Sequence, residues 1–143
     1  MDDTADAEVL IFADACIREV TDEGVQQLIA NCMRNGVGLA GGRILKANGE
    51  LQYGRMEADG EGKLVYADAG LPKGFTGYFH KAILQQNTDG VSPYLFAVRR
   101  ELLDGWKTEE TADTEAQMIS LCDHIKNEGW RISYVPIATA VLK

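Results

Sequence analysis

The stretch VSPYLFAVRRELLDGW, Val91 to Trp106, joins a buried-looking run to an abruptly charged one. Seven of its first eight residues are apolar, and Ser92 is the exception. Pro93 lies near the start of the run, where a missing backbone donor is tolerated, so "SPYLFAV" predicts a strand. The following "RRELLDGW" predicts a short helix. Arg99 and Arg100 therefore stand where a strand ends, which in α/β folds is a common place for ligand-binding side chains.

Composition limits the choice of fold and partner. The chain has 143 residues, 45% of them apolar, which predicts a single domain spanning 1–143. A net charge of −8, without a cluster of Lys or Arg, disfavours nucleic acid as a partner. No apolar stretch approaches the roughly 20 residues of a membrane span, and the first residues are acidic where a signal peptide would be basic. We expect a cytoplasmic protein without a membrane span, in which a peripheral membrane association stays open.

The cysteines favour free thiols over a disulfide framework or a zinc site. Cys16, Cys32 and Cys122 are odd in number and widely spaced, and they form no CxxC pair. Cys32 and Cys122 each fall on the apolar stripe of an expected helix. We therefore predict that both are buried and free.

The N-terminal third alternates strand and helix. The run EVLIF, Glu8 to Phe12, predicts a strand, and Thr21 can cap a helix that follows it. The apolar stripe of that helix is Val25, Leu28, Ile29, Cys32 and Met33. Asn35-Gly36 ends the helix, and "VGLAGGRILK" predicts the next strand. A strand, a helix and a strand in this order predict an α/β sheet with flanking helices.

The middle of the chain contains a turn signal and two less regular segments. In "GRILKANGELQYGRM", Asn48-Gly49 predicts a hairpin with a two-residue turn. The segment Glu57–Gly74 is rich in Gly, Asp and Lys and is interpreted as a surface excursion around "KLVYA". The segment GYFHKAILQ, 77–85, fits either a helix or a strand and could cover a cleft as a lid.

The C-terminal part predicts one more helix and strand. Thr114 and Gln117 have the spacing of a capping box, and Gly129 can end the helix. The buried stripe is expected to be Met118, Leu121, Cys122 and Ile125. "WRISYVPIATAVL" then returns as a strand.

Four segments together resemble a known family. In chain order they are "EVLIFADAC", "GLAGGRILKANGELQYGR", "SPYLFAVRRELLDGW" and "SLCDHIKNEGWRISYVPIA". The pattern resembles family 2 glycosyltransferases with the GT-A fold, in which a strand ending in Asp-x-Asp precedes a helix, a "GGRI" hairpin, a strand ending in an Arg pair and a helix closing with "GYR". The resemblance runs from Glu8 to Ala138 and covers only the later, acceptor-side half of such an enzyme. It implies a three-layer-like mixed sheet without the N-terminal nucleotide-binding half.

The resemblance also implies an activity and its donor site. It implies transfer of a sugar from a nucleotide-diphosphate donor to a glycan or lipid-linked acceptor, in polysaccharide or cell-envelope synthesis. Arg99 and Arg100 would bind the donor, because a guanidinium offers a planar fork of donors to a diphosphate. Asp14 occupies the first position of the Asp-x-Asp motif and would bind donor or a Mg²⁺ or Mn²⁺ ion. Cys16 stands at the second position, and a thiol is a poor ligand for these hard cations.

An inverting transfer further needs a carboxylate that accepts the proton of the acceptor hydroxyl. In the family this residue belongs to an acidic pair at the start of the last helix. Counting back from "EGWRI" without a gap places Gln117 and Met118 there, and neither is a base. A shift of a few residues brings in Asp113 or Glu115 as the catalytic residue. Both also suit the N-terminus of a helix, where the macrodipole favours acids.

Two other functions remain open from the sequence. One is a non-catalytic relative that binds glycan or nucleotide-sugar, or assembles with a protein, after losing both carboxylate positions. The other is a different α/β domain, such as a nucleotidyltransferase, with a similar fold and different chemistry. A fold lacking its first half would expose a strand edge, through which we expect a homodimer. All glycosyltransferase assignments assume that Asp14, the Arg pair and an acid near residue 113 converge on one pocket.

Overall fold

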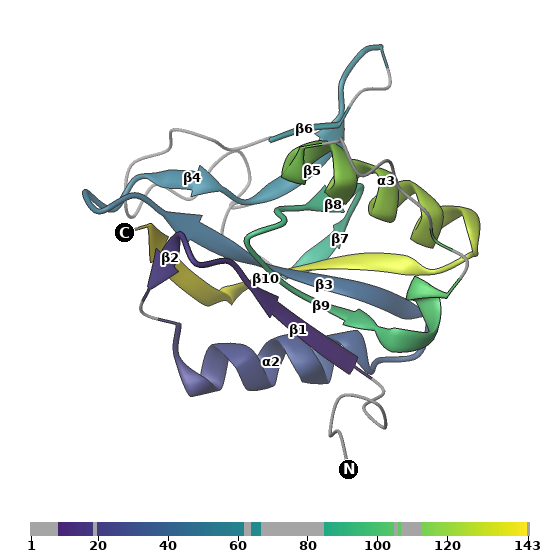
Figure 1. Cartoon of the computed structure of the whole chain (residues 1–143), viewed down its shortest axis with the longest axis horizontal. Coiled ribbons are helices and arrows are strands. Elements are labelled where there is room, and N and C mark those ends of the chain that lie inside the picture. The colour runs from purple at the N-terminus through teal and green to yellow at the C-terminus, as the bar shows by residue number, and fades with distance from the viewer. Residues whose placement is uncertain are drawn as a thin grey trace.

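A computed structural model of the chain describes residues 9–18, 20–61, 64–66, 85–104, 106 and 113–142. It is a mixed α/β structure in which strands predominate (Figure 1). The strands are β1 (Val9–Ala13), β2 (Ile17–Arg18), β3 (Val37–Leu45), β4 (Leu51–Tyr53), β5 (Arg55–Ala58), β6 (Leu64–Tyr66), β7 (Gln86–Thr88), β8 (Gly90–Val91), β9 (Leu95–Arg99) and β10 (Arg131–Leu142). The helices are α2 (Asp22–Cys32), the 3₁₀ helix η2 (Arg100–Leu103) and α3 (Thr114–Asn127).

The main sheet contains β9, the strand predicted from "SPYLFAV", next to its edge strand β1. Its order is β1-β9-β3-β10-β2, with β4 paired to β3 and β7 paired to β10. β9 is antiparallel to both of its neighbours, β1 and β3, whereas β3 and β10 are parallel. The strand-helix-strand unit β1-α2-β3 is therefore present as expected, but β9 lies between its two strands.

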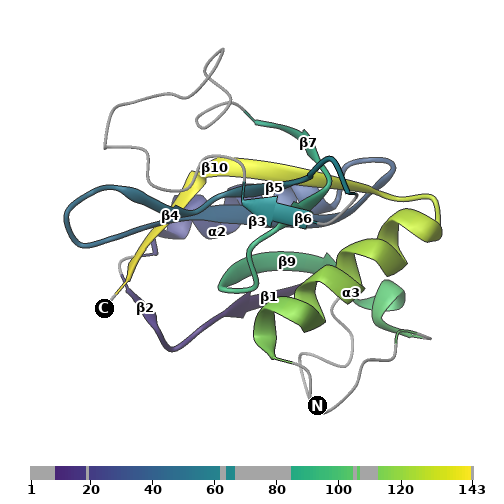
Figure 2. The same cartoon turned by 90° about the horizontal axis from the view of Figure 1, so that it is seen from above.

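Both faces of the main sheet are covered, which makes three layers. Leu39, Phe96 and Val98 point to the side of α3, while their sequence neighbours Ala40 and Ala97 point to the side of α2. Because side chains alternate along a strand, each strand contributes to two hydrophobic cores. Figure 1 shows α2 on one side of the sheet and α3 with the small sheet β6-β5-β8 on the other, and Figure 2 shows the same layers from above.

The two long helices begin and end close to the predicted residues. The Thr21 hydroxyl accepts a hydrogen bond from the Gly24 amide at 3.0 Å and caps α2. The N-cap of α3 is Asp113, one residue before the predicted Thr114, and its carboxylate accepts from the Ala116 amide at 2.7 Å. Gly129 follows α3 with a φ of 88°, as a helix-ending glycine does. The four residues predicted to form the buried stripe of α3 are all buried.

The predicted hairpin connects β3 and β4, but its turn is longer than expected. The Gly49 amide donates to the Lys46 carbonyl at 2.9 Å, and the Lys46 amide donates to the Glu50 carbonyl at 2.8 Å. Gly49 has a φ of 90°. These bonds enclose a three-residue loop with glycine at its last position, which is the next most common hairpin geometry after the two-residue turn.

The segment interpreted as a surface excursion partly belongs to the core. β5 and β6 form a hairpin in the second sheet, and Leu64 is buried against α3. Within the segment Glu57–Gly74, residues 62–63 and 67–74 lie outside the described residues. Residues 77–84 of the segment considered as a lid also lie outside them. In the part of the chain that is described, no helix has the length and apolar character needed to cross a membrane.

Candidate functional site

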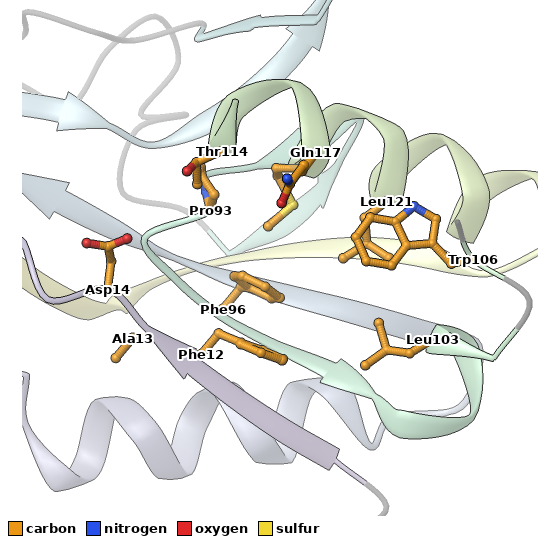
Figure 3. Close-up of a pocket in the computed structure, with 11 residues that line it drawn as sticks. Phe12, Ala13, Asp14, Pro93, Phe96, Leu103, Trp106, Thr114, Gln117 and Leu121 are labelled. Carbon is orange, nitrogen blue, oxygen red and sulfur yellow. The ribbon is translucent and has the colours of Figure 1, made fainter. Parts of the chain in front are cut away.

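A cavity of about 360 Å³ lies between the end of β1, the turn before β9 and one face of α3 (Figure 3). We call it the α3 pocket. Its size falls within the roughly 300–1,000 Å³ of typical small-molecule sites. The polar residues that line it are Asp14, Thr114 and Gln117. The apolar ones are Phe12, Ala13, Pro93, Phe96, Leu103, Trp106, Met118 and Leu121.

Stacked aromatic rings form the side of the pocket opposite α3. The rings of Phe12 and Phe96 lie 4.9 Å apart between centroids and are inclined by 14°. Phe96 is buried, whereas Phe12 is 42% exposed because β1 is the outermost strand of the sheet. A large exposed apolar ring inside a cavity is a typical contact surface for a ligand.

Asp14 stands at one end of the pocket, directly after β1. Its carboxylate accepts a hydrogen bond from the Cys16 amide at 2.9 Å, the local turn that Asp favours after a strand. This backbone bond, together with a bond from the Cys16 side chain, lowers the pKa of Asp14. The exposed carboxylate is therefore ionised at neutral pH and keeps free lone pairs for a ligand hydroxyl.

The described residues do not offer a divalent-metal site around Asp14. Within those ranges, no group of three or more His, Cys, Asp or Glu residues could hold a metal ion. Mg²⁺ and Mn²⁺ prefer several oxygen ligands, and the neighbour in the motif position is the thiol of Cys16. Among the described residues that line the pocket, Asp14 is the sole carboxylate.

The two acids predicted as catalytic lie at the start of α3 but do not line the pocket. Asp113 is the N-cap described above, and one of its carboxylate oxygens accepts from the Ala116 amide. The carboxylate of Glu115 accepts hydrogen bonds from the hydroxyls of Tyr66, at 2.7 Å, and Tyr94, at 3.0 Å. Each acid therefore has a structural partner.

Glu115 is the centre of a tyrosine cluster that the sequence did not reveal. The ring of Tyr53 packs against those of Tyr66 and Tyr94, with centroid distances of 5.1 and 4.5 Å. Burial, and then the bond to Glu115, raises the pKa of Tyr66 far above its ordinary value. The tyrosines come from three separated segments, so no local sequence pattern predicts that they form a cluster. The cluster ties the first turn of α3 to β6 and to the turn beside Asp14.

The two residues that the ungapped count from "EGWRI" places at the family's acidic pair line the α3 pocket. They are Gln117 and Met118, and Figure 3 shows Gln117 directed into the cavity from α3. Asp14 lies on the same cavity. Positions 14 and 117–118, distant in sequence, thus come together in space.

Arg99 holds the backbone instead of facing the pocket. Its Nε donates to the Val37 carbonyl at 2.7 Å, and its NH2 group donates to the Arg34 carbonyl at 3.0 Å. The guanidinium carbon also lies 4.8 Å from the ring centroid of Trp130. Arg100 begins η2, is half-buried and does not line the pocket.

The expectation that Asp14 and the Arg pair converge is wrong. β1 and β9 are antiparallel, so Ala13 pairs with Leu95 and Val9 pairs with Arg99. Asp14 lies five residues beyond Val9, so at about 3.4 Å per residue Asp14 and Arg99 lie about 17 Å apart at opposite ends of this ribbon. The prediction assumed that the C-terminal ends of both strands meet at one edge, which holds only for parallel strands.

Trp106 both anchors its turn and lines the pocket. Its indole Nε1 donates to the Ser120 hydroxyl at 3.2 Å, which attaches the indole to α3. Sequence reasoning missed Phe12 and Phe96 as pocket residues. The alternation of β1 and β9 could have shown that these two rings share a face, had the pairing of the strands been known.

Comparison with known proteins identifies no family. No protein-family model matches the chain. The chain is similar to the uncharacterized protein y4gI of Sinorhizobium fredii (strain NBRC 101917 / NGR234), with 24% identity over 138 residues. The match covers 92% of this chain and 15% of that protein. The chain therefore spans about 15% of the length of this relative.

Proposed function

We propose that the chain is a glycosyltransferase-like domain, the acceptor-side portion of a family 2 enzyme with a GT-A fold, and that the α3 pocket binds the acceptor sugar. The observation that carries the proposal is the meeting of Asp14 with Gln117 and Met118 on one cavity. The resemblance assigns both places to the chemistry of transfer, and they are about a hundred residues apart in the sequence. The three-layer mixed sheet is compatible with this fold.

The chemistry of the pocket suits a neutral sugar. The C–H-rich face of a sugar ring can pack on Phe12, while its hydroxyls can bond to Asp14 and Gln117. No Lys or Arg is among the described residues that line the pocket. A nucleotide diphosphate would need such cations, so we assign the donor to groups outside this cavity.

Binding experiments test this assignment. We expect calorimetric titration to detect weak binding of neutral mono- or oligosaccharides and no heat from UDP-glucose or UDP-N-acetylglucosamine with Mn²⁺. Phe12→Ala and Asp14→Asn should each weaken saccharide binding roughly tenfold, the loss of one stacking contact or one charge-assisted hydrogen bond. Val65→Ala is the matched control, because Val65 is an exposed apolar residue away from the pocket. Absence of saccharide binding across a broad panel contradicts the proposal.

A second candidate is a non-catalytic glycan-binding module. It is favoured by the pocket lining, in which Asp14 is the sole carboxylate among the described residues. During transfer, the acceptor oxygen bonds to the anomeric carbon, the diphosphate leaves, and the hydroxyl proton needs a base. Neither Asp113 nor Glu115 lines the pocket. Joining the chain to the nucleotide-binding half of a family 2 glycosyltransferase and incubating this fusion with a bound glycan, UDP-sugars and Mn²⁺, followed by mass spectrometry, distinguishes the candidates, since only an enzyme extends the glycan.

A further inference from the structure

A second depression continues beyond the α3 pocket along the outer face of α3. We call it the outer pocket. Trp106 forms one side, and the α3 residues Ser120, Asp123, His124 and Asn127 contribute polar groups. The outer pocket is more open than the α3 pocket, and its volume is about 580 Å³.

Trp106 belongs to the lining of both pockets. Figure 3 shows the α3 pocket extending from Asp14 at one end to Trp106 at the other, and the shared Trp106 places the outer pocket next to this second end. Both pockets use the same stretch of α3, but at about 3.6 residues per turn their α3 residues lie on different faces of the helix. A ligand that contacts both pockets must therefore pass across the indole of Trp106, which a single sugar ring is too short to do.

The polar groups of the outer pocket match hydroxyls better than charges. Asp123 is 59% exposed and has a long ion pair of 3.9 Å with Lys126, so its carboxylate can still accept hydrogen bonds. The exposed amide of Asn127 both donates and accepts. His124 Nε2 lies 3.0 Å from the Leu102 carbonyl, which can only accept, so Nε2 donates to it and Nδ1 is left for a ligand. A flat indole beside acceptors and an amide fits an uncharged polyhydroxyl ligand.

We propose that the α3 pocket and the outer pocket bind consecutive residues of one glycan, with Trp106 between them. The acceptor is then an oligosaccharide of at least two sugar residues rather than a monosaccharide. This inference rests on the proposed function and specifies the class of acceptor.

The test measures how affinity depends on glycan length. The chain is applied to an array of neutral mono-, di- and trisaccharides of hexoses and N-acetylhexosamines, and the strongest ligand is then titrated beside its own monosaccharide. We expect at least tenfold tighter binding of the di- or trisaccharide. Replacing Asp123→Asn and Asn127→Ala together should remove this gain and leave monosaccharide binding unchanged. Asn87→Ala, at an exposed amide on β7, is the control and should change neither affinity.

The outcomes separate the two proposals. Equal affinity for monosaccharide and oligosaccharide, or a length gain that survives the double substitution, overturns the two-pocket inference while the proposed function stands. Failure of every saccharide on the array to bind overturns the proposed function itself, and the two-pocket inference with it.

Discussion

At the scale of single residues, Arg99 and Arg100 are adjacent in sequence and differ in their environment. Arg99 donates to the backbone carbonyls of Arg34, after α2, and Val37, at the start of β3, and lies over Trp130. Arg100 starts η2 and is half-buried. Sequence alone treats the pair as equivalent, because it records the charge of each side chain but not the carbonyls that it reaches.

This difference predicts unequal effects on stability. Arg99→Ala should lower the free energy of unfolding by about 2–3 kcal/mol, because it removes two charge-assisted hydrogen bonds and a cation–π contact. Arg100→Ala should change it by less than about 0.5 kcal/mol. Urea unfolding of the two variants beside the parent chain measures both values. If Arg99→Ala lowers the free energy of unfolding no more than Arg100→Ala does, the contacts of Arg99 contribute little.

The cysteines allow a test of burial at single residues. Burial raises the pKa of Cys32 and of Cys122 to about 11, and Cys16 is half-exposed. Because the thiolate is the reactive form, a thiol-specific reagent at pH 8 should modify Cys16 first and the other two only as the chain unfolds. Mass spectrometry of partly labelled protein identifies the sites. Rapid labelling of all three in the native protein would contradict the described core.

The same shifts predict a loss of stability in alkali. The folded-state pKa of Cys122 lies above the ordinary value of 9.0, so the folded chain holds its proton more tightly. Its contribution is complete below pH 9 and is lost as the pH rises toward 11. The drop in unfolding free energy between pH 8 and pH 10 should be about 1 kcal/mol smaller in Cys122→Ala than in the parent chain. An unchanged drop would rule out this linkage.

At the scale of elements, β3 depends on glycines for its close contacts. A Cβ at Gly41 would lie 2.2 Å from the Cβ of Val91, and one at Gly42 would lie 2.4 Å from the Ala138 carbonyl oxygen. Real atoms do not approach so closely, so the glycines let β8 and the bulged part of β10 pack against β3. Close packing against β3 thus explains the two adjacent glycines of "AGGR".

We predict that Gly41→Ala lowers the free energy of unfolding by about 2–3 kcal/mol through overpacking against Val91. Gly60→Ala is the matched control, because a Cβ there meets nothing within 4 Å. Thermal or urea unfolding compares the two variants. If Gly41→Ala is as stable as Gly60→Ala, the contact between β3 and β8 is not tightly packed.

At the scale of the whole molecule, the edge of the main sheet is the feature with consequences for assembly. Among the described strands, β1 pairs with β9 alone and lies at the end of the strand order. The Asp14 amide donates to the Tyr94 carbonyl. Because donors alternate in an antiparallel pair, the amides of Ile11 and Ala13 point toward the open edge. Such an edge can receive a strand from another chain or from another part of a longer protein.

We predict that the isolated chain dimerises through β1 at micromolar concentration or above. Light scattering over a concentration series should show a rise in mass. Ala13→Pro should reduce the rise, because proline removes one outward donor at an exposed position. Leu95→Ala serves as a stability control, since it weakens the core without touching the edge. A constant monomer mass at all concentrations would contradict dimerisation.

The sequence by itself determined what depends on neighbours in the chain. Capping at Thr21, the buried stripe of α3, the glycine turns at Gly36 and Gly129 and the buried free thiols all follow from local spacing and side-chain chemistry. The tertiary structure alone decided the direction of β9, which separates Asp14 from Arg99, and the assembly of Phe12, Phe96 and Trp106 into one pocket. Strand pairing depends on contacts between residues far apart in the sequence and on packing at both faces of the sheet. Local spacing therefore does not predict it.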